Sequence, residues 1–327
     1  MDRIKNIKDL AILAGVSAGT VSRALAGSEL ISLKTRERIK ALADEHGFRP
    51  NVLARNLRIQ RTGAIGVVVP VAHSAGEQLA DPFLIAMLGL LADALTERGY
   101  DLLLSRVVPV GDQWLDHYIS SGRVDGVVLV GQRDDLAAIE LAAEHFKPLV
   151  VWGAEIDGQA ACTVGGDNRK GGALAAGHLV ERGCKHIAFF GDNGPVEAAL
   201  RWEGAREAVN TAGPGVRLDH LADSEALAKA YSTRKGAPDG IFAASDLLAA
   251  QAMDVIRRQG LRVPDDVRVI GYDGLAIGAR VTPPLSTISQ RMEEGARKLV
   301  DILLRRIGGE NTASVVLEPQ LIVREST

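Results

Sequence analysis

Cysteine is scarce in this sequence, and long apolar segments are absent. The only two cysteines among the 327 residues, Cys162 and Cys184, belong to no CxxC or CxxH pattern, so neither a disulfide framework nor a structural zinc site is expected. No run of eighteen apolar residues occurs, so no transmembrane helix is expected. Residues 1–9 are polar and charged and lack the apolar core of a secretory signal. We therefore expect a cytoplasmic protein.

Recognisable catalytic motifs are missing as well. The sequence contains neither a GxxxxGK phosphate-binding loop nor an HExxH motif, and residues 165–171 lack the GxGxxG order of a dinucleotide-binding loop. The seven histidines show no metal-ligand spacing. We predict that the protein is not an enzyme and that it uses no cofactor and no metal.

The composition is that of a globular protein, but its charge is unevenly distributed. Hydrophobic residues make up 46% of the chain and charged residues 24%, and the length suffices for two or more folding units. Residues 1–61 contain twelve Lys or Arg and six Asp or Glu, a net charge of +6, so the remainder carries −9. A basic segment is typical of a polyanion-binding region, although charge alone fits a solvated surface equally well.

Apolar residues at helical spacing predict three short helices in the basic segment. Each follows a side chain that can cap its N-terminus and precedes a glycine. They are Ile7–Ala14 between Asn6 and Gly15, Ala18 to about Ala26 between Ser17 and Gly27, and a third from Leu33 between Ser32 and Gly47. Two helices joined by a tight glycine-containing turn are typical of a DNA-binding helix-turn-helix. Periodicity alone leaves a small helical cap on an enzyme as the alternative.

The second helix has the features of a recognition helix. It presents Ala18, Gly19, Ser22 and Arg23 outward, and short side chains let a helix enter a major groove while Arg23 reads guanine. Residues 15–19 also match the GxSxG nucleophile elbow of hydrolases. That motif requires a strand before the serine, whereas residues 9–14 favour a helix. We therefore interpret Ser17 as a helix cap.

Six motifs make this segment similar to the DNA-binding head of LacI/GalR-type transcriptional regulators. They are Ile7–Ala11, Ala14–Ser17, Thr20–Leu25, Lys34–Ile39, Phe48–Asn51 and Ala54–Leu57. The resemblance implies that Ala18, Gly19 and Arg23 face base edges. It also implies a hinge helix at about 51–59, whose Leu57 wedges between base steps in the minor groove. The DNA-binding residues expected on this basis are Ser17, Ala18, Gly19, Thr20, Ser22, Arg23, Asn51, Ala54, Arg55 and Leu57.

Residues 62–327 alternate apolar strands with helices. The apolar run at 63–70 favours a strand that is buried on both faces. Further strands are expected at 100–105, 124–131, 148–153, 186–191, 240–244 and 267–272, and helices at 82–98, 111–121, 136–145, 171–182, 198–212 and 247–259. Such βαβ repeats predict two parallel sheets with a cleft between them, and ligands bind beyond the carboxyl ends of the strands.

Motifs in this region resemble the effector domain of the same family, which has the periplasmic-binding-protein fold. They are Asp81–Phe83, Val124–Val127, Asp167–Gly172, Ile270–Asp273 and Pro283–Ile288. The resemblance implies an all-α helix-turn-helix head with a hinge helix at 1–61, joined to a two-lobed α/β effector-binding and dimerisation domain at 62–327. Crossings near Gly165, Gln290 and Leu317 would give a first lobe of about 62–165 and 291–316. The second lobe would comprise about 166–290 and 317–327.

Five residues are candidates for contacting a small-molecule effector: Phe83, Asp167, Arg201, Ser245 and Asp273. The family places an effector-contacting arginine where Arg201 stands, and a surface ion pair is the alternative. Asp273 follows an apolar strand, where a carboxylate either accepts hydrogen bonds from sugar hydroxyls or caps a loop. Phe83 either stacks on a sugar ring or belongs to the core, whereas core packing is favoured for Trp152. Ser245 stands where the family usually has Asn, and Gly274 where many relatives have a second Asp.

The sequence thus predicts a homodimeric transcriptional regulator that binds palindromic operator DNA. We expect a repressor of carbohydrate-utilisation genes that a small sugar effector releases from DNA. The alternative is a solute-binding protein of a sugar transporter, which would share the body but would have no use for residues 1–61. A sugar-cleaving enzyme is a third and more distant interpretation.

Overall fold

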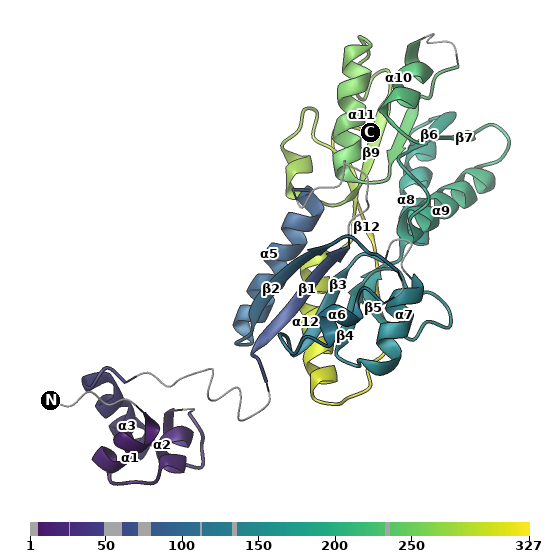
Figure 1. Ribbon diagram of the computed structural model, residues 1–327. Coiled ribbons are helices and arrows are strands. Elements are labelled where there is room, and N and C mark those ends of the chain that lie inside the picture. The colour runs from purple at the N-terminus through teal and green to yellow at the C-terminus, as the bar shows by residue number, and fades with distance from the viewer. Residues whose placement is uncertain are drawn as a thin grey trace. The chain divides into compact units, whose positions relative to one another are not determined.

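The chain folds into two compact units in the computed structural model, which describes residues 6–25, 27–48, 61–70, 80–111, 113–132, 136–232 and 236–327. The units are Met1–Thr62, here called the head, and Gly63–Thr327, the body. The head has its own hydrophobic core, and four further clusters of buried side chains lie in the body. Figure 1 shows the helical head and the two lobes of the body.

Three helices make up the described part of the head: α1 (Ile7–Ala14), α2 (Ala18–Leu25) and α3 (Leu33–Glu45). Side-chain oxygens of Asn6 and Ser32 accept backbone N–H groups at the starts of α1 and α3, and Ser17 accepts the amide of Thr20 over 3.1 Å. The predicted helices and caps are therefore confirmed. In the described residues no strand precedes Ser17, so the nucleophile-elbow interpretation is excluded. The head core consists of Leu10, Ala11, Ala14, Val21, Ala24, Ile39, Ala43 and Phe48.

The body contains two six-stranded sheets. The first sheet has the order β11-β5-β4-β3-β1-β2 and is parallel throughout, and the second has the order β12-β10-β9-β8-β6-β7, parallel except for the β10–β12 pair. The first comprises β1 (Ala64–Pro70), β2 (Asp101–Val107), β3 (Gly126–Val130), β4 (Leu149–Trp152), β5 (Cys162–Gly166) and β11 (Val315–Leu317). The second comprises β6 (His186–Phe190), β7 (Arg217–Leu221), β8 (Gly240–Ala243), β9 (Arg268–Asp273), β10 (Ser286–Ser289) and β12 (Gln320–Ile322).

Helices cover both faces of each sheet, as the strands' apolar composition requires. In the first lobe, Val67 of β1 packs toward α5 and α12, whereas its neighbour Val68 packs toward α7. In the second lobe, Phe189 of β6 packs toward α8 and α9, and Phe190 packs toward α10 and α11. The helices of the body are α5 (Pro82–Glu97), α6 (Asp116–Ile119), α7 (Leu136–His145), α8 (Asn168–Glu181), α9 (Val196–Ala212), α10 (Ser224–Ser232), α11 (Asp246–Arg258), η1 (Ala276–Ala279) and α12 (Met292–Ile307).

The chain passes between the two sheets three times. It leaves the first sheet after β5, returns between β10 and α12, and leaves again between β11 and β12. Helix α12 therefore packs on the first sheet although the whole second lobe except β12 precedes it; in Figure 1 this yellow helix lies among the blue and teal elements. Both lobes are thus built from separate segments of sequence.

One predicted element is wrong in extent. The helix expected at 111–121 is limited to α6, Asp116–Ile119. Gly111 has a φ of 71°, and Trp114 and Leu115, which lie in a turn, are buried against the first sheet. The apolar side chains there fill the core without continuing a helix. The sequence interpretation also left out β5, β7, α10, β10, α12, β11 and β12.

Candidate functional site

The exposed face of α2 carries Gly19 and Arg23. The Nε group of Arg23 donates to the carbonyl of Gly19 over 3.3 Å, which aligns the guanidinium with the helix surface. Ser17 and Thr20 are joined through their hydroxyls at 2.9 Å at the N-terminus of the same helix. Ala18 is only partly exposed and packs against the head core, so little of its side chain is available to contact a base. The exposed arginine is the longest donor that α2 offers.

Two arginines of α3 fix the turns on either side of α2. Arg36 donates from Nη1 to the carbonyl of Gly27 over 2.8 Å, and Arg38 donates from Nη2 to the carbonyl of Ala14 over 2.9 Å. These bonds tie the ends of α1 and α2 to α3 and so orient the exposed α2 face. The predicted hinge helix and its residues Asn51, Ala54, Arg55 and Leu57 lie outside the described residues.

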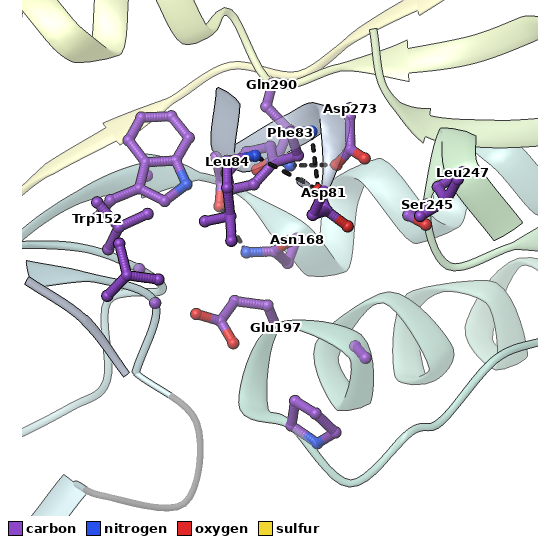
Figure 2. A pocket seen from close by; sticks show the side chains of 18 of the residues that line it. Asp81, Phe83, Leu84, Trp152, Asn168, Glu197, Ser245, Leu247, Asp273 and Gln290 are labelled. Carbon is purple, nitrogen blue, oxygen red and sulfur yellow. Dashed lines mark hydrogen bonds between the residues drawn. The ribbon is translucent and has the colours of Figure 1, made fainter. Parts of the chain in front are cut away.

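A cavity of about 550 Å³ lies between the two lobes of the body. The strands β1, β3, β4 and β5 of the first lobe end at it, as do β8, β9 and β10 of the second. This is where parallel α/β sheets bind ligands, because the helices that follow the strands begin there. Figure 2 shows side chains from both lobes facing the cavity, including Phe83 and Trp152 from one side and Asp273 and Glu197 from the other.

Arg201 of α9 is buried in the floor of this pocket. Its Nε donates to Oδ1 of Asn168 over 2.8 Å and its Nη1 donates to the carbonyl of Ala244 over 2.7 Å. The guanidinium carbon lies 3.8 Å from the centre of the Tyr272 ring, a cation–π distance. Asn168 in turn donates to the carbonyl of Gly166. Arg201 therefore joins three elements of the second lobe and is preorganised, and the alternative of a surface ion pair does not describe its contacts.

The position of Arg201 depends on close packing of α8 against α9. A Cβ atom at Gly172 of α8 would lie 2.0 Å from the carbonyl oxygen of Arg201, closer than any real contact allows. Glycine is thus required there because the two backbones nearly touch. The DNRKGG motif of residues 167–172 therefore has a structural role that places the arginine.

Asp273 is buried at the end of β9 with a backbone conformation that is unusual for a non-glycine residue. Its φ is 122°, and such strain is commonly retained at functional sites. The carboxylate accepts the Nε2 amide of Gln290 over 2.7 Å and the backbone amide of Asp246 over 3.4 Å. Burial raises the pKa of this carboxyl above its ordinary value. Asp273 is therefore a pocket residue, and the loop-cap alternative does not describe its contacts.

A second buried carboxylate stands behind Asp273. Asp246 accepts the hydroxyl of Thr287 over 2.5 Å and the backbone amide of Leu275 over 2.7 Å, and burial raises the pKa of Asp246 to about 6. An aspartate at position 274 is not accommodated, because a Cβ on Gly274 would lie 2.8 Å from the Cα of Ser289. The second carboxylate near Asp273 thus comes from α11 and supports the pocket from outside.

Phe83 and Trp152 form an aromatic wall on the first-lobe side of the pocket. Their ring centroids are 6.4 Å apart and both rings line the cavity. Trp152 is also largely buried in the first-lobe core, so its ring packs in the core and lines the cavity at once. Trp202, in contrast, packs on Phe189 and His220 in the second lobe.

Four of the five predicted effector residues line the pocket: Phe83, Arg201, Ser245 and Asp273. Ser245 also caps α11 by accepting the amide of Leu248 over 3.2 Å. Asp167 is not among the described lining residues; its carboxylate accepts the amide of Lys170 over 2.9 Å and caps α8. Contact of each residue with an effector remains a prediction.

The sequence interpretation missed four polar residues of the site: Asp81, Asn168, Glu197 and Gln290. Asn168 and Gln290 hold Arg201 and Asp273, and each lies at a crossing between the lobes. The available signal was their position directly beyond the ends of β5 and β10. Glu197 stands in the first turn of α9 and lines the pocket.

Comparisons with known proteins agree for both units. Residues 6–51 match the family described as "Bacterial regulatory proteins, lacI family", and residues 176–327 match "Periplasmic binding protein-like domain". The HTH-type transcriptional regulator CelR of Thermobifida fusca is 34% identical to this chain, and the match covers 99% of the chain and 98% of the relative. The chain belongs to the LacI family. The ribose operon repressor of Haemophilus influenzae, 29% identical, matches over 98% of both chains.

Solved structures of LacI-family proteins have the same architecture. The lac repressor dimer bound to operator and the anti-inducer ONPF has a TM-score of 0.80 and 25% identity, with 99% of each chain covered. A complex of the transcriptional regulator CelR with cellobiose has a TM-score of 0.68 and 32% identity, covering 99% of this chain and 100% of that one. The predicted fold is thereby confirmed, and this LacI-family chain is a DNA-binding transcriptional regulator.

No helix of the described residues is both long and apolar enough to cross a bilayer. Nor do His, Cys, Asp and Glu side chains gather in groups of three or more that could hold a metal ion, within the same described part of the chain.

Proposed function

We propose that the protein is a repressor that binds a palindromic operator as a homodimer and is released from it by a small sugar. It acts in the cytoplasm and catalyses no reaction. One observation carries the proposal: a helix-turn-helix head and a two-lobed body with a polar interlobe pocket occur in one chain. Relatives named as repressors and the CelR–cellobiose complex support it.

The pocket has the chemistry that a sugar requires. Sugars expose hydroxyl groups along their edges and C–H groups on their ring faces. Arg201 offers N–H donors and Asn168 an amide that can donate and accept. Asp273 offers acceptor oxygens, and Phe83 offers a flat apolar surface. The cavity of about 550 Å³ lies in the usual range for small-molecule sites, which is about 300–1,000 Å³.

A dimer is supported by apolar side chains on one side of the first lobe. Ile85 of α5 is 56% exposed and Leu104 of β2 is 40% exposed, and β2 is an edge strand against which α5 packs. Exposed apolar groups on neighbouring elements are typical of subunit interfaces. Two copies joined here would present two heads, as a palindrome requires.

Release follows from the lobes' freedom to close on a ligand. A sugar bound between the lobes changes their separation and hence the spacing of the two heads in a dimer. Only a ligand with different affinities for the two spacings shifts the equilibrium, and typical coupling is about 1–3 kcal/mol. A sugar that prefers the DNA-free spacing acts as an inducer. The proposal includes the insertion of Leu57 between base steps in the minor groove of the operator.

The solute-binding alternative makes an opposite prediction for the head. A transporter component would have no use for α1–α3, so a form that begins at Thr62 would keep every activity. The deciding experiment is a gel-shift assay with the promoter region of the protein's own gene, titrated with sugars. The full chain should shift this DNA, the form beginning at Thr62 should not, and one sugar should reverse the shift. DNA binding by the truncated form, or none by the full chain, would contradict the proposal.

A further inference from the structure

Acidic side chains outnumber basic ones in the pocket. Among the described residues that line it, the ionisable groups are the carboxylates of Asp81, Glu197 and Asp273 and one guanidinium, that of Arg201. Asp81 enters from the first lobe, whereas the other three belong to the second. A ligand enclosed between the lobes therefore meets carboxylates from both sides.

Three of these four groups already have partners. Asp81 accepts the backbone amides of Phe83 and Leu84 over 2.8 and 3.3 Å, and Asp273 accepts Gln290. Arg201 donates to Asn168 and to a carbonyl group. Within the described residues the side chain of Glu197 makes no hydrogen bond or ion pair. Figure 2 shows its carboxylate pointing into the open space of the pocket.

Glu197 also places a negative charge at the start of a helix that borders the pocket. Helices α5, α8, α9 and α11 all begin at the pocket, and helix N-termini attract anions through their free N–H groups. The side chains of Asp81, Asp167 and Ser245 cap three of them. Pro195 precedes α9 at the N-cap position and provides no side-chain cap, and Glu197 is the acidic residue in the first turn of α9.

We propose that Glu197 is a specificity-determining residue that makes the pocket select uncharged and amine-bearing sugars and reject sugars that carry a carboxylate or a phosphate. The inference rests on the proposed function, because it concerns the ligand of the same pocket. The carboxylate accepts hydrogen bonds from sugar hydroxyl or ammonium groups and repels an anionic substituent. Repulsion is strong there because the closing lobes displace water.

A purely structural role for Glu197 makes a different prediction. An acidic residue in the first turn stabilises a helix through its dipole, so its loss would lower thermal stability. It would not alter the preference between neutral and anionic ligands. The ratio of two affinities therefore separates the roles, since a general loss of stability or binding cancels in it.

The test compares matched sugars by calorimetry with the full chain. The pairs are glucose with glucuronate, cellobiose with cellobiuronate, and ribose with ribose 5-phosphate. The wild type should bind at least one neutral member at least about tenfold more tightly than its anionic partner. Glu197→Gln should reduce that ratio about tenfold or more. The control is Glu203→Gln, because Glu203 lies on the same helix, forms an ion pair with Arg169 and does not line the pocket.

Equal ratios in the two variants, or a wild type that binds both members of a pair alike, would overturn the inference. If none of these sugars binds, the proposed sugar effector is what fails, and inorganic phosphate decides about Glu197. The Glu197→Gln variant should then have a higher melting temperature in phosphate than in chloride of equal ionic strength. The melting temperatures of the wild type and of Glu203→Gln should be the same in both salts. The same change in melting temperature in all three proteins would refute the proposal that Glu197 excludes anionic ligands.

Discussion

The side-chain amide of Gln290 donates a hydrogen bond to the buried carboxylate of Asp273 over 2.7 Å. Gln290 lies between β10 and α12, where the chain crosses from the second lobe to the first. Asp273 lines the pocket at the end of β9. A ligand that contacts Asp273 therefore contacts a group that is bonded directly to a connection between the lobes. One hydrogen bond thus connects a pocket carboxyl group to a crossing between the lobes.

Conservative substitution of the buried charges should abolish the sugar response. Arg201→Lys cannot reproduce the paired bonds to Asn168 and Ala244, and Asp273→Asn replaces one carboxyl oxygen with an amide group that can only donate. Because altering a buried, hydrogen-bonded charge costs about 2–5 kcal/mol, sugar affinity should fall at least about thirtyfold in each variant. Operator binding should persist. Calorimetry and a gel shift measure both quantities, and wild-type sugar affinity in both variants would remove the two residues from the site.

The packing of α8 against α9 can be tested with two glycines of one helix. Gly172→Ala should destabilise the body by about 1–3 kcal/mol and weaken sugar binding, because the added methyl group pushes against Arg201. Gly177→Ala should be neutral or stabilising by up to about 1 kcal/mol, since a Cβ there has no atom within 4 Å. Urea unfolding measures both. Similar destabilisation in the two variants would argue against a packing role for Gly172.

Base readout by α2 should depend on Arg23. Arg23→Ala should cost about 1–3 kcal/mol at one base pair of each half-site and leave the other positions of the operator unchanged. Selection of binding sites from random DNA measures this preference. The matched control is Lys40→Ala, which removes an exposed cation from α3 instead of α2. If the selected sites of both variants equal those of the wild type, Arg23 does not read bases.

The buried carboxylate Asp246 should make stability depend on pH. Its raised pKa, about 6 against an ordinary 3.8, means that the folded body favours the protonated form. The protonated Asp246 carboxyl therefore contributes fully to the free energy of unfolding below about pH 4, and this contribution is lost as the pH rises through 6. The Asp246→Asn variant has no carboxyl group to ionise at this position. Its melting temperature relative to that of the wild type should therefore be higher at pH 7.5 than at pH 4.5. Thermal unfolding at both pH values checks this, and a pH-independent difference would show that Asp246 does not titrate in that range.

The proposed dimer surface should respond to charge. Ile85→Asp should shift the protein toward monomers in sedimentation experiments and weaken operator binding, because a desolvated carboxylate is costly at an apolar interface. Leu141→Asp places the same charge on α7, whose helix covers the opposite face of the first sheet. That variant should remain dimeric. A dimeric Ile85→Asp protein, or monomers from both variants, would place the contact elsewhere.

Local patterns predicted most of the elements that surround the pocket. Buried parallel strands are continuous apolar runs, so Gly63–Pro70 and Val267–Tyr272 were recognisable without any neighbour. β7 was not predicted because its sequence RLDHL is largely polar and it lies at the edge of its sheet. β12 pairs antiparallel with β10 late in the chain, and its three residues give too short a pattern. Short edge strands depend on partners that are distant in sequence.

Two pocket residues were predicted on different grounds. Asp273 was recognised because it follows an apolar strand, and Arg201 because the family resemblance implies an effector-contacting arginine there; both line the pocket. Their partners were not predictable, because Asn168 and Arg201 are brought together only when α8 packs on α9. The same holds for Asp246, whose partners Thr287 and Leu275 lie about 30 to 40 residues further along the chain. Contacts between distant segments leave no local signal.

The three crossings between the lobes also affect how the protein is made. Met292, Leu299 and Leu303 of α12 lie in the core of the first lobe, and β11 completes its sheet. When β1–β5 have been synthesised, α5 and α7 are already present, but the α12 side chains that complete the cover of one face are not. Until about the last tenth of the chain emerges, one face of the first sheet stays partly uncovered and is prone to aggregation. Messages truncated before α12 should yield insoluble protein, even though every residue of the head is present.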